Sequence, residues 1–390
     1  MSGIELVHPG TQRTEEVFDL QSDRNDEFGF GIEGEFLLLN AATGRPLRLE
    51  ELDFQQLRRL VDGIPADDIS SDGLNIKPLH VKACPFLIEG YYLTDSDMKP
   101  TRMLPKGIEI RTPIAATIED SIDTLKTMFE RLQERLRREG LSAAVISHHP
   151  TASDLEAPQN YRRHDYWQWA LTAATTYGPD INISLPRKLS DRIDRDHLAR
   201  KINHYLPPLI ALTLNSPFYL GDLWRVGGRI GKSIRTFRRS RWAPLCYIHE
   251  KPRLRYEFKG FEMSPYLSDY QAMFLVSLAI LLDGSLDGRA TELVARDELR
   301  EIAIAGLAVP TVRKRASIII ESARATARKL GFGDRGLDVF AGRLEGEQLP
   351  ANEIISTFET KGSINGTMRT LTHLSDGQRP GTGVSLKASS

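Results

Sequence analysis

The segment 28-FGFGIEGEFLLLN-40 constrains the fold more than any other part of the sequence. Its alternation predicts a β-strand that directs apolar side chains such as Ile32 and Phe36 to one face. Glu33 and Glu35 then share the opposite face, about 7 Å apart along the strand. Two carboxylates in this arrangement suit oxygen ligation of one or two hard divalent cations, and magnesium is the cation that we expect.

Other segments extend this strand into a sheet. Strand patterns recur in residues 74–95, 106–113, 141–147, 180–186 and 253–263. Helical patterns appear at 49–62, 117–140, 161–176 and 191–215, and after the last strand at 266–283, 288–306 and 311–330. Because several strands come before a run of helices, the order favours an α+β fold with a mostly antiparallel sheet. We expect an acidic metal- and nucleotide-binding face on this sheet, helices on its other side, and a helical C-terminal part from about residue 264.

Composition excludes several functional classes. The 390 residues carry a formal net charge of -1, which argues against broad attraction to nucleic acid or anionic lipid. The longest apolar run, 272–282, is too short to span a bilayer, and the first residues lack a signal-peptide pattern. Two cysteines, Cys84 and Cys246, are too few for a disulfide framework. We therefore expect a cytoplasmic protein that binds neither nucleic acid nor membrane.

The most informative feature is a set of acidic residues within the predicted strands: Glu33, Glu35, Glu89, Glu109, Asp180, Glu257 and Glu262. For any one of them, a solvated carboxylate on an open sheet face is the commoner explanation. Together they would repel one another across neighbouring strands, so such a face needs metal or protein cations as compensation. Arg111 follows Glu109 by two residues and Lys259 follows Glu257 by two, which places each cation on the face of its acid.

A second cationic group precedes the last predicted strand and consists of Arg235, Arg238, Arg239 and Arg241. Arginine suits bidentate contacts with phosphate or carboxylate, although a solvated loop explains these residues equally well. Acids, metal and fixed cations together match phosphoryl transfer, in which metal ions bridge nucleotide phosphates and Lys or Arg stabilises the moving phosphoryl group. The pattern by itself does not identify the acceptor.

Two glycine-rich motifs support competing hypotheses. Residues 29–34 match G-x-G-x-x-G, but no strand precedes them and no helix follows, as a dinucleotide fingerprint requires. Residues 227–233, GGRIGKS, are close to a P-loop, but Val226 occupies the position of the first required glycine. A dinucleotide or P-loop enzyme would need these glycines to contact phosphate.

Residues 31–36, GIEGEF, resemble the opening GIExEF strand of the glutamate-cysteine ligase and YbdK-like carboxylate-amine ligases. Further resemblances follow in the family's order. Residues 109–113 resemble its ExxTP strand, His149-Pro150 its HP segment, residues 214–218 its NSPF turn, and residues 256–259 its late ExR strand.

The resemblance implies a glutamine-synthetase-like sheet whose acidic face holds magnesium and ATP. The metal ligands that we expect are Glu33, Glu35, Glu109 and Glu257, to which we add Asp180. The expected catalytic residues are Arg111, Arg235 and Lys259, and the expected nucleotide contacts are Arg235, Arg238, Arg241 and Lys259. The implied reaction transfers the γ-phosphoryl group of ATP to a carboxylate, and an amine then attacks the acyl phosphate to form an amide.

Three departures from the family pattern leave the substrates open. Asp180 and Asn182 stand where the family usually has His-x-His. Lys259 replaces an arginine, which changes a bidentate fork into a point charge. The usual ENxWxAxR helix is hardly recognisable in residues 296–300, so glutamate and cysteine are not assumed as substrates.

The carboxylate and the amine are therefore expected to be small molecules or peptides. The alternative from another class is a catalytically weakened relative that binds nucleotide or peptide. We expect a polar N-terminal segment at 1–27, a ligase catalytic domain at 28–372 and a flexible tail at 373–390. The oligomeric state, including a homo-oligomer, stays open.

Overall fold

The computed structural model describes residues 27–70, 74, 85–95, 97, 99–159, 163–250, 254–292, 295–346 and 348–376. Residues 1–26 and 377–390, which belong to the predicted terminal segments, lie outside the described residues. So do residues 75–84 of the predicted strand region 74–95. Ser375, within the predicted tail, forms a β-bridge with Tyr266.

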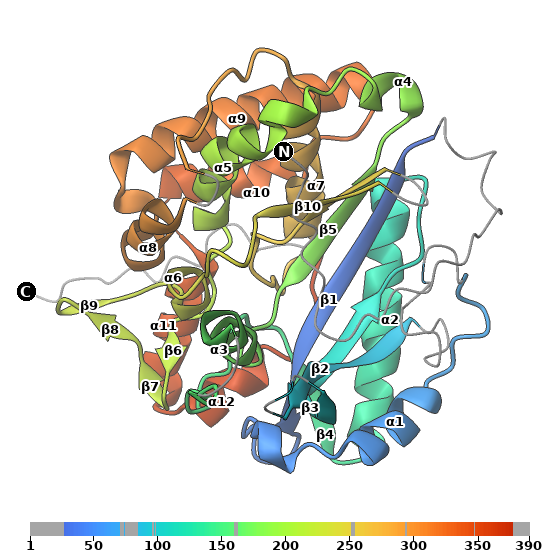
Figure 1. Ribbon diagram of the computed structural model, residues 1–390, viewed down its shortest axis with the longest axis vertical. Helices are drawn as coiled ribbons and strands as arrows, with labels where there is room; N and C mark the ends of the chain where they lie inside the picture. The colour runs from blue at the N-terminus through green and yellow to red at the C-terminus, as the bar shows by residue number, and fades with distance from the viewer. Residues whose placement is uncertain are drawn as a thin grey trace, which may run out of the picture.

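An antiparallel sheet forms the centre of the described part of the chain, with strand order β10-β11-β5-β1-β3-β2 and with β4 paired to β1 (Figure 1). The α+β fold with an antiparallel sheet is thus confirmed. Its strands are β1 (Gly29–Asn40), β2 (Phe86–Thr94), β3 (Pro100–Arg111), β4 (Leu141–Ala144), β5 (Pro179–Ser184), β10 (Cys246–His249) and β11 (Arg255–Phe258).

β3 differs most from the sequence prediction, because it begins at Pro100 instead of residue 106. β1 pairs with β3 only from Ile108 to Arg111, so the earlier part of β3 has β2 as its strand neighbour among the described residues. Pro105 lies in that part, beside a register shift in β2. A proline is tolerated there because no second strand requires its missing N–H.

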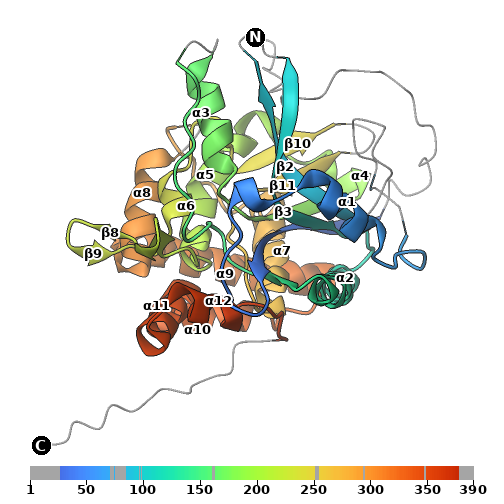
Figure 2. The same ribbon diagram turned by 90° about the horizontal axis from the view of Figure 1, so that it is seen from below.

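Two helices cover one face of the sheet. Figure 2 shows α2 (Ile118–Arg138) and α7 (Leu267–Leu282) on one side and α3 (His164–Ala173) on the other. Thr117 caps α2, since its side chain accepts a hydrogen bond from the Asp120 N–H at 3.0 Å. Phe36 is fully buried and its ring packs on Phe129 of α2, with 4.8 Å between centroids. The apolar face predicted for β1 is therefore the face that packs on helices.

The remaining helices are α1 (Phe54–Asp62), α4 (Arg187–Ser190), α5 (Arg195–Ala211), α6 (Ile234–Phe237), α8 (Arg296–Ala305), α9 (Pro310–Leu330), α10 (Leu337–Gly346), α11 (Pro350–Lys361) and α12 (Ile364–Thr370), with 3-10 turns η1 (Leu49–Glu51) and η2 (Gly306–Ala308). They confirm a helical C-terminal part, although α8 begins at Arg296 and not at residue 288 as predicted.

Two short hairpins pair β6 (Phe218–Tyr219) with β7 (Asp222–Leu223) and β8 (Arg225–Val226) with β9 (Arg229–Ile230). Within the described ranges, no helix combines the length and the apolar character that a bilayer crossing needs.

Gly107 marks a close backbone approach between β3 and β1. A Cβ atom at this position would lie 2.2 Å from the carbonyl oxygen of Phe36. Because a strand backbone cannot move aside cheaply, we expect Gly107→Ala to lower the free energy of unfolding by about 1–3 kcal/mol in a urea titration. Gly284→Ala is the control, since its Cβ would meet nothing within 4 Å. Equal losses of stability in the two variants would contradict this reading of the contact.

Candidate active site

Carboxylates from three strands meet on the sheet face that points away from α2 and α7. The antiparallel register places Glu33 of β1 beside Asp180 of β5, and Glu257 of β11 beside Asn182 of β5. Carboxylate oxygens of Glu33, Asp180 and Glu257 all lie within 4.8 Å of one another. Three of the five acids proposed as metal ligands from the sequence are therefore neighbours in space.

Lysine and arginine side chains bind these three acids. The Lys259 Nζ atom donates to Glu257 Oε1 at 2.6 Å and also to Asp180 Oδ2. Arg255 Nη1 lies 3.4 Å from Glu33 Oε1, and its Nη2 lies 3.6 Å from Glu257 Oε2. The predicted pairing of Lys259 with Glu257 is confirmed. Arg255 was missed, although strand alternation places it on the same face two residues before Glu257.

Arg111 connects this cluster to the next carboxylate along the sheet. Its Nε atom lies 2.9 Å from Glu109 Oε1 and 3.4 Å from Glu33 Oε2. The predicted pairing of Arg111 with Glu109 is confirmed. Glu109 is buried, and this burial raises its pKa well above the usual value of a carboxyl group.

Glu35 binds a cation that the sequence analysis did not single out. Lys106 is 2% exposed, and its Nζ atom lies 2.9 Å from Glu35 Oε2 and 3.9 Å from Glu89 Oε1. Glu35 Oε2 also accepts a hydrogen bond from the Gly178 N–H at 2.9 Å. Glu35 and Glu109 therefore lie beside the three-acid cluster and not in it. Nothing in the sequence around Lys106, the first residue of the predicted strand 106–113, indicates that it pairs with Glu35.

The electrostatics of the face are uneven. Burial, together with the Glu257 and Glu33 carboxylates, raises the pKa of Asp180 to about 8 in spite of Lys259. Burial opposes ionisation of Glu257 as well, but Lys259, a hydrogen bond from His249 and the nearby Arg255 hold its pKa well below the usual range. The face thus concentrates carboxylates to the point where Asp180 and Glu109 both resist ionisation.

The donor set fits a hard divalent cation. Carboxylate oxygens are the ligands that magnesium prefers, and the three-acid cluster supplies them from three neighbouring strands. Six carboxylates lie on this part of the sheet: Glu33, Glu35, Glu89, Glu109, Asp180 and Glu257. Four lysine or arginine side chains pair with them, namely Lys106, Arg111, Arg255 and Lys259. When all six are ionised, the carboxylates outnumber these cations, and a bound divalent cation would compensate the difference.

Arg235 and Arg239 contact the segment that follows β11, which begins with Lys259. Arg235 Nη1 donates to the Phe261 carbonyl at 2.8 Å, and Arg239 Nη1 donates to the Lys259 carbonyl at 3.0 Å. The guanidinium of Arg235 packs against Gly178, where a Cβ atom would lie 2.2 Å from it. Arg235 thus contacts the chain just before β5 and just after β11, and among the described residues it forms no ion pair with the carboxylates of the acidic face.

The other two arginines of the predicted nucleotide-binding group are held by acids outside the cluster. Arg238 Nη1 lies 2.5 Å from Asp154 Oδ1, and its guanidinium stacks 5.6 Å from the ring centre of Tyr219. Arg241 forms an ion pair with Asp165 at the start of α3. The roles predicted for Arg238 and Arg241 in nucleotide binding stay predictions.

Glu262, the last acid of the predicted set, has a structural environment. It is fully buried and accepts hydrogen bonds from the Asn215 N–H at 2.7 Å, the Ser216 hydroxyl at 2.9 Å and the Thr236 hydroxyl at 2.7 Å. Ser233, the serine of the P-loop-like motif, also donates to Glu262. The hydroxyl of this serine therefore binds a carboxylate, whereas a P-loop serine would bind the magnesium ion of a nucleotide.

The other glycine motif lies within β1, and the P-loop-like segment contains β9 and the turn that joins it to β8. Neither arrangement presents a glycine loop to the start of a long helix, as phosphate binding at a helix N-terminus requires.

Comparison with known proteins agrees with this geometry. The model of glutamate-cysteine ligase family 2 matches residues 29–243, which is more than half of the chain. The chain belongs to this family. The resemblance drawn from the GIEGEF segment is confirmed.

Named relatives match over part of their length. A Jannaschia sp. (strain CCS1) protein that carries a provisional glutamate–cysteine ligase 2 name is 26% identical over 207 residues, which are 52% of this chain and 44% of that protein. The glutamate–cysteine ligase of Haloquadratum walsbyi is 26% identical over 119 residues, 29% of this chain and 32% of that protein. The chain thus spans less than half of the length of these relatives.

Solved structures share the fold at low identity. A glutamate–cysteine ligase from Francisella tularensis, solved with AMP, matches with a TM-score of 0.58 at 12% identity. The match covers 89% of this chain and 87% of the Francisella chain. The Pup ligase PafA, solved in complex with Pup, has a TM-score of 0.53 at 14% identity, with coverages of 86% and 69%. These likenesses show that this chain, a member of glutamate-cysteine ligase family 2, shares the fold of solved ligase structures.

Proposed function

We propose that this family member is an ATP- and magnesium-dependent carboxylate–amine ligase that forms an amide through an acyl phosphate. The observation that carries the proposal is the meeting of Glu33, Asp180 and Glu257 from three strands, with Lys259 bonded to two of them. The names of the relatives and the AMP in the Francisella structure support nucleotide use and ligation. The compartment that we propose is the cytoplasm.

The three acids are the residues that would hold Mg²⁺, and the bound ion would supply positive charge against the ATP phosphates. In this proposal Lys259 neutralises the transferred phosphoryl group. Its ammonium lies beside two of the acids that would hold the metal, and therefore close to where the phosphates would bind. Arg111 and Arg255 flank Glu33 and keep that carboxylate ionised, since both favour its charged form.

The proposed chemistry consists of two substitutions. An oxygen of the substrate carboxylate attacks the γ-phosphorus of ATP, the bond to the β-γ bridging oxygen breaks, and ADP leaves. The nitrogen of the amine then attacks the acyl carbon, and inorganic phosphate leaves as the amine loses a proton. The protein contributes positioning and fixed charge, on which catalysis of phosphoryl transfer depends almost entirely.

The direct test is ADP release by the full chain with MgATP and pools of amino acids and peptides. We expect release that depends on both a carboxylate and an amine, and a product lighter by one water than its two parents in mass spectrometry. Omission of magnesium should abolish release. A protein that binds MgATP but never releases ADP in response to an amine would overturn the ligase proposal in favour of a catalytically weakened binding relative.

A further inference from the structure

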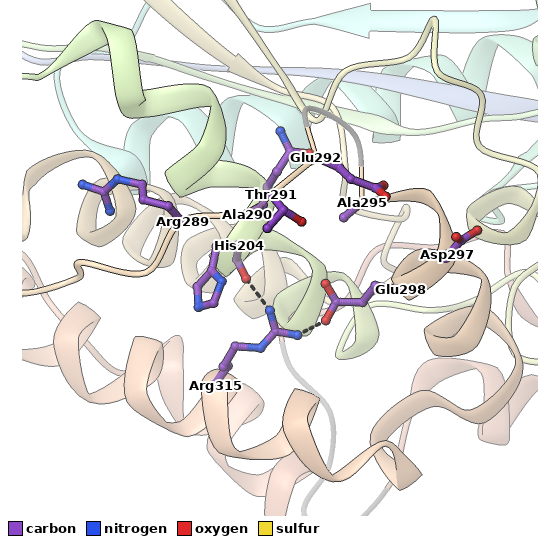
Figure 3. A pocket seen from close by; sticks show the side chains of 10 residues that line it. His204, Arg289, Ala290, Thr291, Glu292, Ala295, Asp297, Glu298 and Arg315 are labelled. Atoms are coloured by element: carbon purple, nitrogen blue, oxygen red, sulfur yellow. Dashed lines mark hydrogen bonds and ion pairs between the residues drawn. The ribbon is translucent and has the colours of Figure 1, made fainter.

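The helical side of the protein contains a cavity of about 350 Å³ between α5, α8 and α9 (Figure 3). Within it, Arg315 pairs with Glu298 and donates to the His204 carbonyl at 2.8 Å, as the dashed lines show. The guanidinium of Arg289 points away from these side chains. The described side chains of this cavity therefore do not converge on one ligand, in contrast to those around a cation that is buried at the acidic sheet face.

That cation is Lys106, the most deeply buried of the four that pair with the acids. Its side chain is 1% exposed, whereas the other three are between 27% and 34% exposed. Its Nζ atom lies 2.9 Å from Glu35 Oε2 and 3.9 Å from Glu89 Oε1, and it donates to the Thr176 carbonyl at 2.8 Å. Two tyrosine rings lie 5.5 and 5.7 Å from the same ammonium. Carboxylates and a backbone carbonyl are also the oxygen ligands of a hard divalent cation.

An irregularity of the sheet brings Lys106 to this face. The pairing of β2 with β3 shifts between Glu89 and Gly90, and Lys106 is the extra residue of β3 at this point, as in a β-bulge. Strict alternation would place Lys106 on the apolar face with the buried Ile108. Bulges re-aim single side chains and are common beside active sites. The local backbone thus directs this ammonium toward the acids.

The contacts of Glu35 separate it from the three-acid cluster. One of its oxygens, Oε2, binds both the Lys106 ammonium and the Gly178 N–H, each at 2.9 Å. Within the described ranges, Glu35 and Glu89 belong to no group of three acids whose oxygens could share an ion. A metal ion at Glu35 would have to displace the ammonium or lie beside it, where the two positive charges repel each other.

We propose that Lys106 is a built-in cation that takes the place of a second metal ion, so that the acidic face binds one divalent cation, at the three-acid cluster. This inference rests on the proposed function, because it takes that cluster as the metal site. Lys106 acts through Glu35 and Glu89 and is therefore a positioning residue. Its charge is part of the chain, so these two outlying acids are neutralised before metal or nucleotide binds.

The test is a titration of the full chain with Mn²⁺, which prefers the same oxygen ligands as magnesium, with free Mn²⁺ measured by electron paramagnetic resonance and no nucleotide present. We expect one ion per chain. Lys106→Gln should bind two, because loss of the ammonium frees Glu35 and Glu89 as ligands. Lys126→Gln is the matched control and should bind one, since it removes a lysine from an exposed ion pair with Asp376.

The outcomes separate this inference from the metal site on which it rests. One ion in both the wild type and Lys106→Gln would overturn the inference and leave the metal site in place, and two or more ions in the wild type would overturn it as well. No ion in the wild type but one in Lys106→Gln would support the role of the lysine and refute the three-acid site. No ion in either protein would refute both.

Glu35→Gln provides the test if Lys106→Gln does not fold, as checked by circular dichroism. Because Glu35 is not a metal ligand in this inference, the variant should weaken Mn²⁺ binding less than about threefold, whereas Asp180→Asn should weaken it about tenfold or more. A loss in Glu35→Gln as large as that in Asp180→Asn would make Glu35 a metal ligand and contradict the proposed role of Lys106.

Discussion

Asp180→Asn should lower amine-dependent ADP release by about 10²–10³-fold, the size of effect seen when one preorganised electrostatic contact to a transition state is removed. Asp180 is the middle member of the three-acid cluster, and its carboxylate is bonded to Lys259. The amide keeps the shape but removes one anionic ligand from the proposed magnesium site. Because Lys259 retains its bond to Glu257, we expect little change in the free energy of unfolding.

Steady-state ADP release over a range of magnesium concentrations checks this result. Asp62→Asn is the matched control, since it makes the same chemical change in an exposed helical ion pair with Arg58. If the Asp180 variant turned over at the rate of this control at every magnesium concentration, Asp180 would have no part in the reaction.

Arg343→Met should lower the free energy of unfolding by about 3–5 kcal/mol. Arg343 of α10 and Asp269 of α7 form an ion pair at 2.9 Å with side chains that are 1% and 0% exposed. Arg343 Nη1 also donates to the Leu212 carbonyl at 2.8 Å. Methionine fills similar space but leaves the Asp269 carboxylate buried without its cation, which is the costly part of breaking such a pair.

Urea unfolding of the single variants and of Arg343→Met with Asp269→Asn measures this effect. The double variant should recover part of the lost stability, because the unpaired buried charge is then absent. A loss below about 1 kcal/mol in Arg343→Met would show that the pair contributes no more than a surface ion pair does.

Local patterns in the sequence predicted a large part of this protein. The alternation at 28–40 predicts β1 and assigns Glu33 and Glu35 to the face away from the helices. Thr117 followed by apolar residues at helical spacing predicts α2. The period of two within a strand also pairs Arg111 with Glu109. These features succeed because each depends on residues only a few positions apart, where backbone geometry alone determines which side chains share a face.

Only the tertiary structure decided which of these acids meet. Strand alternation gives the face of a carboxylate but not its neighbour on the next strand, which depends on the order and register of strands that lie far apart in the sequence. Register brings Glu33, Asp180 and Glu257 together, directs Glu35 to Lys106, and leaves Glu262 within a buried hydrogen-bond network. The pairing of Arg343 with Asp269 likewise arises from helix packing, for which no local pattern exists.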